Sequence, residues 1–90
     1  MKSLPDTVVS YKRTPEFDEE SIPEGLLKNH QTKADVWGKI VVLSGHLLYT
    51  IHEPFEEITL DINTFGVVEP TVLHQVKPVG SVRFYVEFYQ

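Results

Sequence analysis

The chain has 90 residues, of which 41% are hydrophobic and 11% aromatic, and its formal net charge is -5 at neutral pH. This size predicts one domain, residues 1–90, with enough apolar residues for a packed core. The negative charge argues against a nucleic-acid partner, because phosphate binding needs clustered basic residues, and the longest basic cluster, Lys12-Arg13, is typical of an ordinary surface.

The absence of cysteine excludes disulfides, thiolate metal sites and cysteine nucleophiles. No apolar run approaches the roughly 20 residues of a membrane span, and the first residues lack the apolar core of a signal peptide. We therefore expect a cytoplasmic protein without a membrane partner.

The first third of the chain predicts one strand followed by irregular structure. Residues 7–12 are rich in β-branched and aromatic side chains, which favour a strand. Residues 14–25 are mostly acidic and turn-like, with Phe17 and Ile22 as expected anchors onto the core. Residues 25–30 could form a short strand or a helical turn, because periodicity over so few residues cannot decide between them.

The middle of the chain predicts strands joined by turns. Residues 37–43 are apolar on both faces, as in a central strand; Ser44-Gly45 then supplies a turn, and residues 46–53 return. Pro54 ends this strand, and residues 56–62 begin another. Alternation in the return strand predicts three residues facing the core: Leu47, Tyr49 and Ile51.

The last third contains the clearest pattern in the chain. A strand around residues 73–76 is closed by Pro78 and Gly80. Residues 82–89 alternate strictly, which predicts four core residues on one face: Val82, Phe84, Val86 and Phe88. About seven or eight short strands without a long helix favour an all-β antiparallel fold, either a closed β-barrel or a two-sheet roll.

Two of the four histidines are candidate metal ligands. His74 shares a strand face with Val72 and Val76, so we expect it to point inward, where a buried imidazole is either hydrogen-bonded or a ligand. His30 follows an apolar stretch and by itself is typical of a surface residue. A metal site would require these two histidines to meet from distant segments, with Glu69 or water completing the shell.

Other residues carry weaker signals. His46 and His52 are about 20 Å apart along an extended strand, so they cannot share an ion and are expected on the solvated face. Trp37 could be a core residue or a pocket wall, since the adjacent Gly38 leaves room for a ligand. The chain has no phosphate-binding glycine-rich loop, nucleophile elbow or serine triad, so no catalytic activity of its own is predicted.

Several short motifs occur in an order that is similar to one family. They are Tyr11-Lys12-Arg13-Thr14-Pro15, Gly25-Leu26-Leu27-x-x-His30, Val36-Trp37-Gly38, Val42-Leu43-x-Gly45-x-Leu47-x-Tyr49, Gly66-Val67-Val68-Glu69-Pro70-x-x-x-His74 and Val82-Arg83-Phe84-Tyr85-Val86-Glu87-Phe88-Tyr89. Together they resemble the small cupin-like domain of the tellurite-resistance TehB-like family and its stand-alone relatives. The resemblance covers nearly the whole chain and implies a jelly-roll β-barrel.

The resemblance also implies roles for particular residues. His74 matches the histidine of the second cupin motif, which is a metal ligand, and His30 is the best candidate for a first-motif histidine. Cupins usually carry a glutamate about seven residues before the glycine that matches Gly45, and here Gly38 stands at that position. The implied cofactor is a divalent transition metal, such as zinc, iron, nickel or manganese.

Two interpretations of function remain open. In the first, the domain binds a metal or small ligand in a tellurite or oxidative-stress response, with Trp37 and Glu69 lining the pocket. An oxyanion ligand would then need Arg13 or Arg83 to offset the negative net charge. In the second, the domain is a metal-free, non-catalytic module that pairs with itself or with a partner such as a methyltransferase. A small domain buries little surface alone, so we expect a homodimer.

Overall fold

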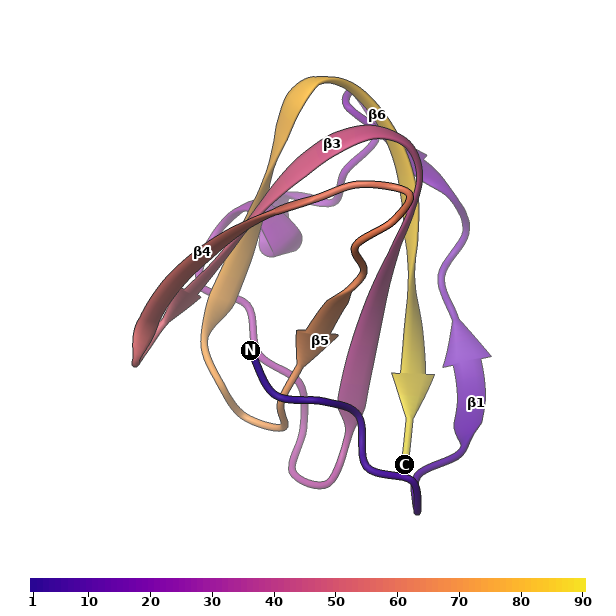
Figure 1. The fold of residues 1–90 in the computed structure, drawn as a ribbon, viewed down its shortest axis with the longest axis vertical. Coiled ribbons are helices and arrows are strands. Elements are labelled where there is room, and N and C mark those ends of the chain that lie inside the picture. Colours follow the sequence, from indigo (N-terminus) through magenta and orange to yellow (C-terminus); the bar gives the residue numbers. More distant parts are fainter.

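The computed structural model describes all residues, Met1–Gln90, and confirms the all-β prediction (Figure 1). The strands are β1 (Ser10–Arg13), β2 (Phe17–Asp18), β3 (Trp37–His52), β4 (Phe55–Leu60), β5 (Gly66–Val68) and β6 (His74–Tyr89). Between residues 25 and 30 the helical alternative is the correct one, since the 3-10 helix η1 covers Glu24–Leu27. The structure contains no helix with the length and hydrophobicity of a membrane span.

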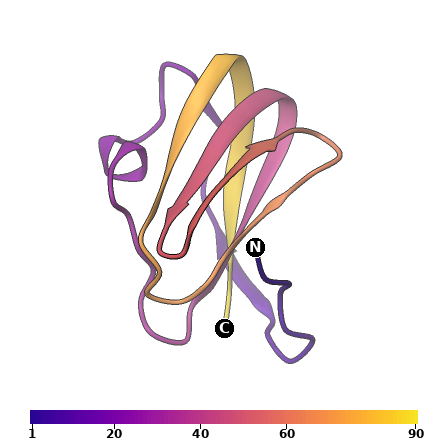
Figure 2. The ribbon, with the colours of Figure 1, turned by 60° about the vertical axis from the view of Figure 1, so that its left-hand side comes forward.

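The two 16-residue strands β3 and β6 form the backbone of one antiparallel sheet. They pair along almost their whole length, from Trp37 opposite Tyr89 to Ile51 opposite His74, and Figure 2 shows them side by side. Strands β1 and β2 pair with β6, while β4 and β5 pair with β3. The strand path ends at β1 and β4, which are not paired with each other, so the predicted closed barrel is not confirmed.

The predicted turn at Ser44-Gly45 is wrong, because β3 continues through it as a bend. The register with β6 shifts on both sides of this pair, and Gly45 has a φ of 75°. A Cβ atom on Gly45 would lie 2.0 Å from the carbonyl oxygen of Ser81 on β6. Such bulges bend and twist a strand without ending it. The sheet therefore has fewer and longer strands than the sequence predicts, and both long strands fold over together.

The core lies on the inner face of the bent sheet and consists of eleven buried side chains: Ile40, Val42, Leu47, Tyr49, Ile51, Leu60, Val68, Val76, Val82, Phe84 and Val86. Both predicted alternating faces are confirmed, except that Phe88 is only half-buried. The segment between β1 and β3 runs along one side of the sheet (Figure 2) and packs Phe17, Ile22 and Leu26 against this core, so both expected anchors are confirmed.

The bend generates the first testable prediction. Gly45→Ala should destabilise the domain by about 1–3 kcal/mol more than Gly80→Ala, because an alanine at 45 meets a backbone oxygen. Gly80 is a matched control, since its φ of 70° imposes similar strain while nothing lies within 4 Å of the added methyl group. Urea unfolding followed by circular dichroism measures both losses, and equal losses would contradict this account of the bend.

Candidate functional site

The backbone brings His30 and His74 together. The His30 amide donates to the His74 carbonyl at 2.7 Å, and the His74 amide donates to the His30 carbonyl at 2.9 Å. This isolated antiparallel bridge ties the segment after η1 to the first residue of β6. Directly opposed residues in such a pair project their side chains to the same face. The expected meeting of the two histidines is therefore observed, while their role as ligands stays a prediction.

The two imidazole rings are in contact and nearly perpendicular. Nδ1 of His30 lies 3.3 Å from Nε2 of His74, with ring centroids 5.2 Å apart. Nδ1 of His74 faces the Val72 carbonyl oxygen at 3.0 Å, and this acceptor requires a proton on Nδ1. Neutral His74 therefore presents a lone pair at Nε2, and Nδ1–H of His30 donates to it.

Burial keeps both imidazoles in the neutral form. Desolvation lowers the pKa of His30, which is half-buried. Desolvation also lowers the pKa of His74, which is 3% exposed; the neighbouring His30 and His52 lower it further, and the bond to the Val72 carbonyl opposes them. Tyr49 closes the inner side, with its ring edge-on to His74 and its hydroxyl donating to the Val67 carbonyl at 2.9 Å. Both shifts favour uncharged imidazoles at neutral pH.

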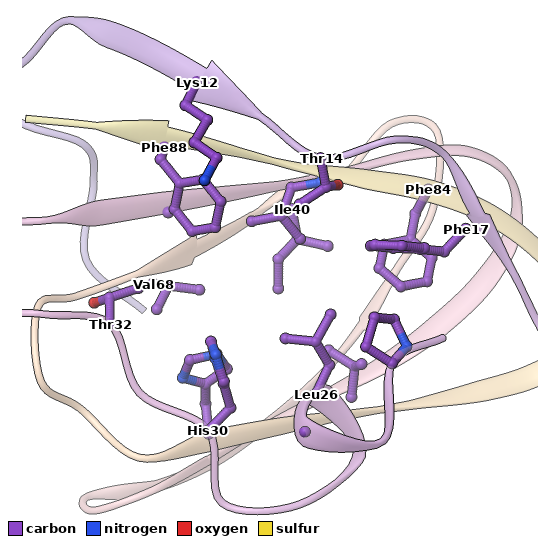
Figure 3. Close-up of a pocket in the computed structure, with 16 residues that line it drawn as sticks. Lys12, Thr14, Phe17, Leu26, His30, Thr32, Ile40, Val68, Phe84 and Phe88 are labelled. Atoms are coloured by element: carbon purple, nitrogen blue, oxygen red, sulfur yellow. The ribbon is translucent and has the colours of Figure 1, made fainter. Parts of the chain in front are cut away.

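The histidine pair borders a cavity of about 340 Å³ between the bent sheet and the segment that contains η1 (Figure 3). Sixteen residues line this cavity, and none of them is an aspartate or glutamate. Most of the wall is aliphatic or aromatic, with Phe17 and Phe84 packed edge to face at 5.6 Å between ring centroids. Its charged or polar side chains are few: Lys12, Thr14, His30, Thr32 and His74.

The other expected site residues lie outside this cavity. Trp37 is half-buried, and its neighbour Gly38 lines the cavity instead, because adjacent strand residues face opposite sides. Glu69 pairs with Lys2 at 3.4 Å. A cofactor-binding role for Trp37 and Glu69 stays a prediction, and no group of three or more His, Cys, Asp or Glu side chains in the structure could hold a metal ion.

The basic residues of the cavity differ from those that the sequence suggested for an oxyanion. The guanidinium of Arg13 lies over the Tyr85 ring, 4.6 Å from its centroid, and Arg83 pairs with Glu16, so neither faces the cavity. Lys12 does line the cavity, although the sequence predicts an ordinary surface residue at this position. The signal in the sequence is the alternation of residues 12–14, which puts Lys12 and Thr14 on the opposite face from Arg13.

Two curated proteins are similar to this chain in sequence. The chain is 30% identical over 83 residues to the probable S-adenosyl-L-methionine-dependent methyltransferase TehB of Haemophilus influenzae strain KW20, and 28% identical to that of strain 10810. Each match covers 87% of this chain but only 29% of the relative. The chain thus spans less than a third of the length of these curated relatives.

Solved structures show the same fold. A crystal structure of a protein from Escherichia coli K12 matches with a TM-score of 0.90 at 20% identity, covering 100% of this chain and 97% of that one. The crystal structure of TehB from Haemophilus influenzae matches with a TM-score of 0.83 at 26% identity, covering 93% of this chain and 32% of that one. A family model described as the TehB-like domain matches residues 12–86, and this chain therefore belongs to the TehB-like domain family.

Proposed function

We propose that this domain is a cupin-like binding module that holds a divalent transition metal between His30 and His74 and takes a small ligand in the adjoining cavity. The observation that carries the proposal is the 3.3 Å approach of Nδ1 of His30 to Nε2 of His74. Two imidazole nitrogens on one tetrahedral ion, with metal–nitrogen bonds of 2.0–2.1 Å, lie about 3.3–3.4 Å apart. The pair is therefore already spaced for a shared ion.

The surroundings of His74 support the same role. Histidines that bind metal usually donate their other ring N–H to a carbonyl or carboxylate, which fixes the tautomer and the ring orientation. The Val72 carbonyl does this for His74, leaving Nε2 free to donate a lone pair. To bind a metal ion through Nδ1, His30 needs only to carry its proton on Nε2 instead. Two imidazole donors suit zinc, nickel or iron better than manganese, which prefers oxygen ligands.

Two protein ligands leave positions on a metal ion that water or a bound molecule must complete. The adjoining cavity of about 340 Å³ gives such a molecule a place, so metal and ligand binding belong to one site. A jelly-roll relationship to cupins, a homodimer and a part in a tellurite or oxidative-stress response remain within this proposal. Because the Haemophilus relatives are named as methyltransferases, we further propose that the module works beside methyl transfer and does not perform it.

Metal content tests the proposal directly. Protein purified without an affinity tag should contain close to one equivalent of zinc, nickel or iron by elemental analysis, because both nitrogens can bind one ion. His74→Ala and His30→Ala should each lower zinc affinity by roughly a hundredfold, since loss of even an outer partner of a metal ligand costs 10–100-fold.

His46→Ala is the matched control for metal binding, because His46 is exposed and lies in β3 away from the cavity lining. It should keep the wild-type metal content. Full occupancy in folded His74→Ala or His30→Ala protein would contradict the site. A metal-free wild-type protein that stays so after reconstitution would make the pair a hydrogen-bonded structural contact.

The metal-free protein should become less stable as pH falls from about 7 to 5. The pKa of His74 in the folded state lies below its usual 6.5, so the unfolded chain binds more protons over this range. The contribution of neutral His74 to the free energy of unfolding is complete above pH 6.5 and is lost as pH falls toward the folded pKa. For one proton, the limiting slope of this free energy is roughly 1.4 kcal/mol per pH unit. Urea unfolding at several pH values should show that the free energy of unfolding depends less steeply on pH in His74→Gln. An unchanged slope would contradict the assignment of this pH dependence to His74.

A further inference from the structure

The cavity opens at the end where Lys12 and other polar side chains lie. Four residues, Lys12, His30, Thr32 and Phe88, line both the cavity and an outer depression that continues over Lys33 and its neighbours. These shared residues therefore mark the mouth. Figure 3 shows Lys12, His30 and Thr32 around this end of the cavity.

The mouth carries positive charge that no carboxylate of the chain neutralises. The four ion pairs of the structure involve other groups, so neither Lys12 nor Lys33 is paired. A β-bulge between Ser10 and Lys12 shifts the register of β1 at this point, and bulges commonly re-aim a side chain. The hydroxyl of Thr32 is already committed, since it donates to the Val36 carbonyl at 2.8 Å. The ammonium of Lys12 is therefore the strongest unused donor on the cavity wall.

The opposite end of the cavity is apolar. Figure 3 places Phe17, Phe84 and Leu26 there, and all three also contact or belong to the hydrophobic core. Because the wall contains no carboxylate, no charged group in the cavity would repel an anion. The histidine nitrogens are the only groups on the wall that could attract a metal cation. The net charge of -5 acts at longer range, and salt screens it over roughly 8 Å at physiological ionic strength.

The size of the cavity limits the ligand. A water molecule in the liquid occupies about 30 Å³, so 340 Å³ corresponds to roughly eleven waters or a molecule of about ten non-hydrogen atoms. A single ammonium on the wall matches a single negative charge. Polarity, charge and volume together describe an elongated molecule with an anionic head and a hydrocarbon tail.

We propose that the cavity binds an amphipathic monocarboxylate of about ten non-hydrogen atoms, with its carboxylate beside Lys12 at the mouth and its tail against Phe17, Leu26 and Phe84. This proposal rests on the proposed function for the location of the site and adds the class of ligand. It assigns recognition of the anion to Lys12 and not to the metal.

The probe is octanoate, an unbranched carboxylate of this size, titrated into the full chain and followed by amide shifts in two-dimensional NMR. Octanoate should bind about tenfold more tightly than 1-octanol, because the ammonium recognises only the charged head. Shortening the acid should weaken binding by about fourfold for each methylene removed, as expected for a buried tail.

Lys12→Met keeps much of the side chain's apolar stem and removes the charge. It should weaken octanoate binding about tenfold and abolish the preference over 1-octanol. Lys77→Met is the matched control, since Lys77 is exposed on β6 and lines neither the cavity nor the depression, and it should bind octanoate like the wild type. Equal wild-type affinity for octanoate and 1-octanol would overturn the proposal even if Lys12→Met failed to fold.

Running the titrations on both chelator-treated and zinc-loaded protein separates this proposal from metal binding. Octanoate bound in both forms with dependence on Lys12 supports the carboxylate site whether or not zinc binds. Zinc bound with full dependence on His74, but without octanoate binding in the millimolar range, would overturn the carboxylate site and leave the metal proposal standing.

Discussion

The fold depends on the continuous pairing of β3 with β6 through a shared bend. Every other strand attaches to one of these two, so the sheet has no core without them. The bend is possible because Gly45 lets the two backbones approach to a distance that a Cβ atom would forbid, with the Ser81 carbonyl in the way. A flat pair of strands would expose core residues near the bend, including Leu47 and Val82, both almost fully buried.

The same pairing places the site. His74 is the first residue of β6 and lies opposite Ile51, so its position along the sheet is set by the long register with β3. Its amide and carbonyl then hold His30, which brings the segment after η1 over the open side of the sheet. Because that segment is not part of the sheet, its side chains do not fill the whole interior, and the cavity remains between Leu26 and the sheet. The cavity is thus the space between a regular sheet and an irregular cover.

Local pattern predicts the faces of this fold better than its connections. Alternation identifies Leu47, Tyr49 and Ile51 as core residues because the period of two is a property of any strand. It cannot distinguish a turn from a bulge at Gly45, since both use a glycine with positive φ and the choice depends on contact with distant Ser81. Closure of a barrel is likewise decided by whether two sheet edges meet, and no local pattern carries that information.

In the candidate site too, local pattern predicts some residues, while others depend on contacts between distant segments. The inward strand face predicts His74, and the family resemblance implies both His74 and His30. The placement of Trp37 in the pocket depends instead on which face of a strand it occupies. A shift of one residue reverses the face, and in the structure Gly38 has the inward position. Alternation separates Lys12 from Arg13, but it does not predict the bulge in β1 or the lack of a paired carboxylate, on which the proposed role of Lys12 depends.

Two of the three non-glycine residues with positive φ lie beside the histidine pair, the third being Asp35. Asn29, directly before His30, and Thr71, in the turn before His74, both have positive φ, at 25° and 63°. Such a conformation is costly for a β-branched threonine, by about 1–3 kcal/mol, and persists only where neighbouring contacts enforce it. The Thr71 amide donates to the Thr32 carbonyl at 3.2 Å, which fixes these two segments against each other next to the paired histidines. Strain and an unfilled cavity both oppose stability, and their coincidence at the two imidazoles supports the proposal that the site admits a ligand.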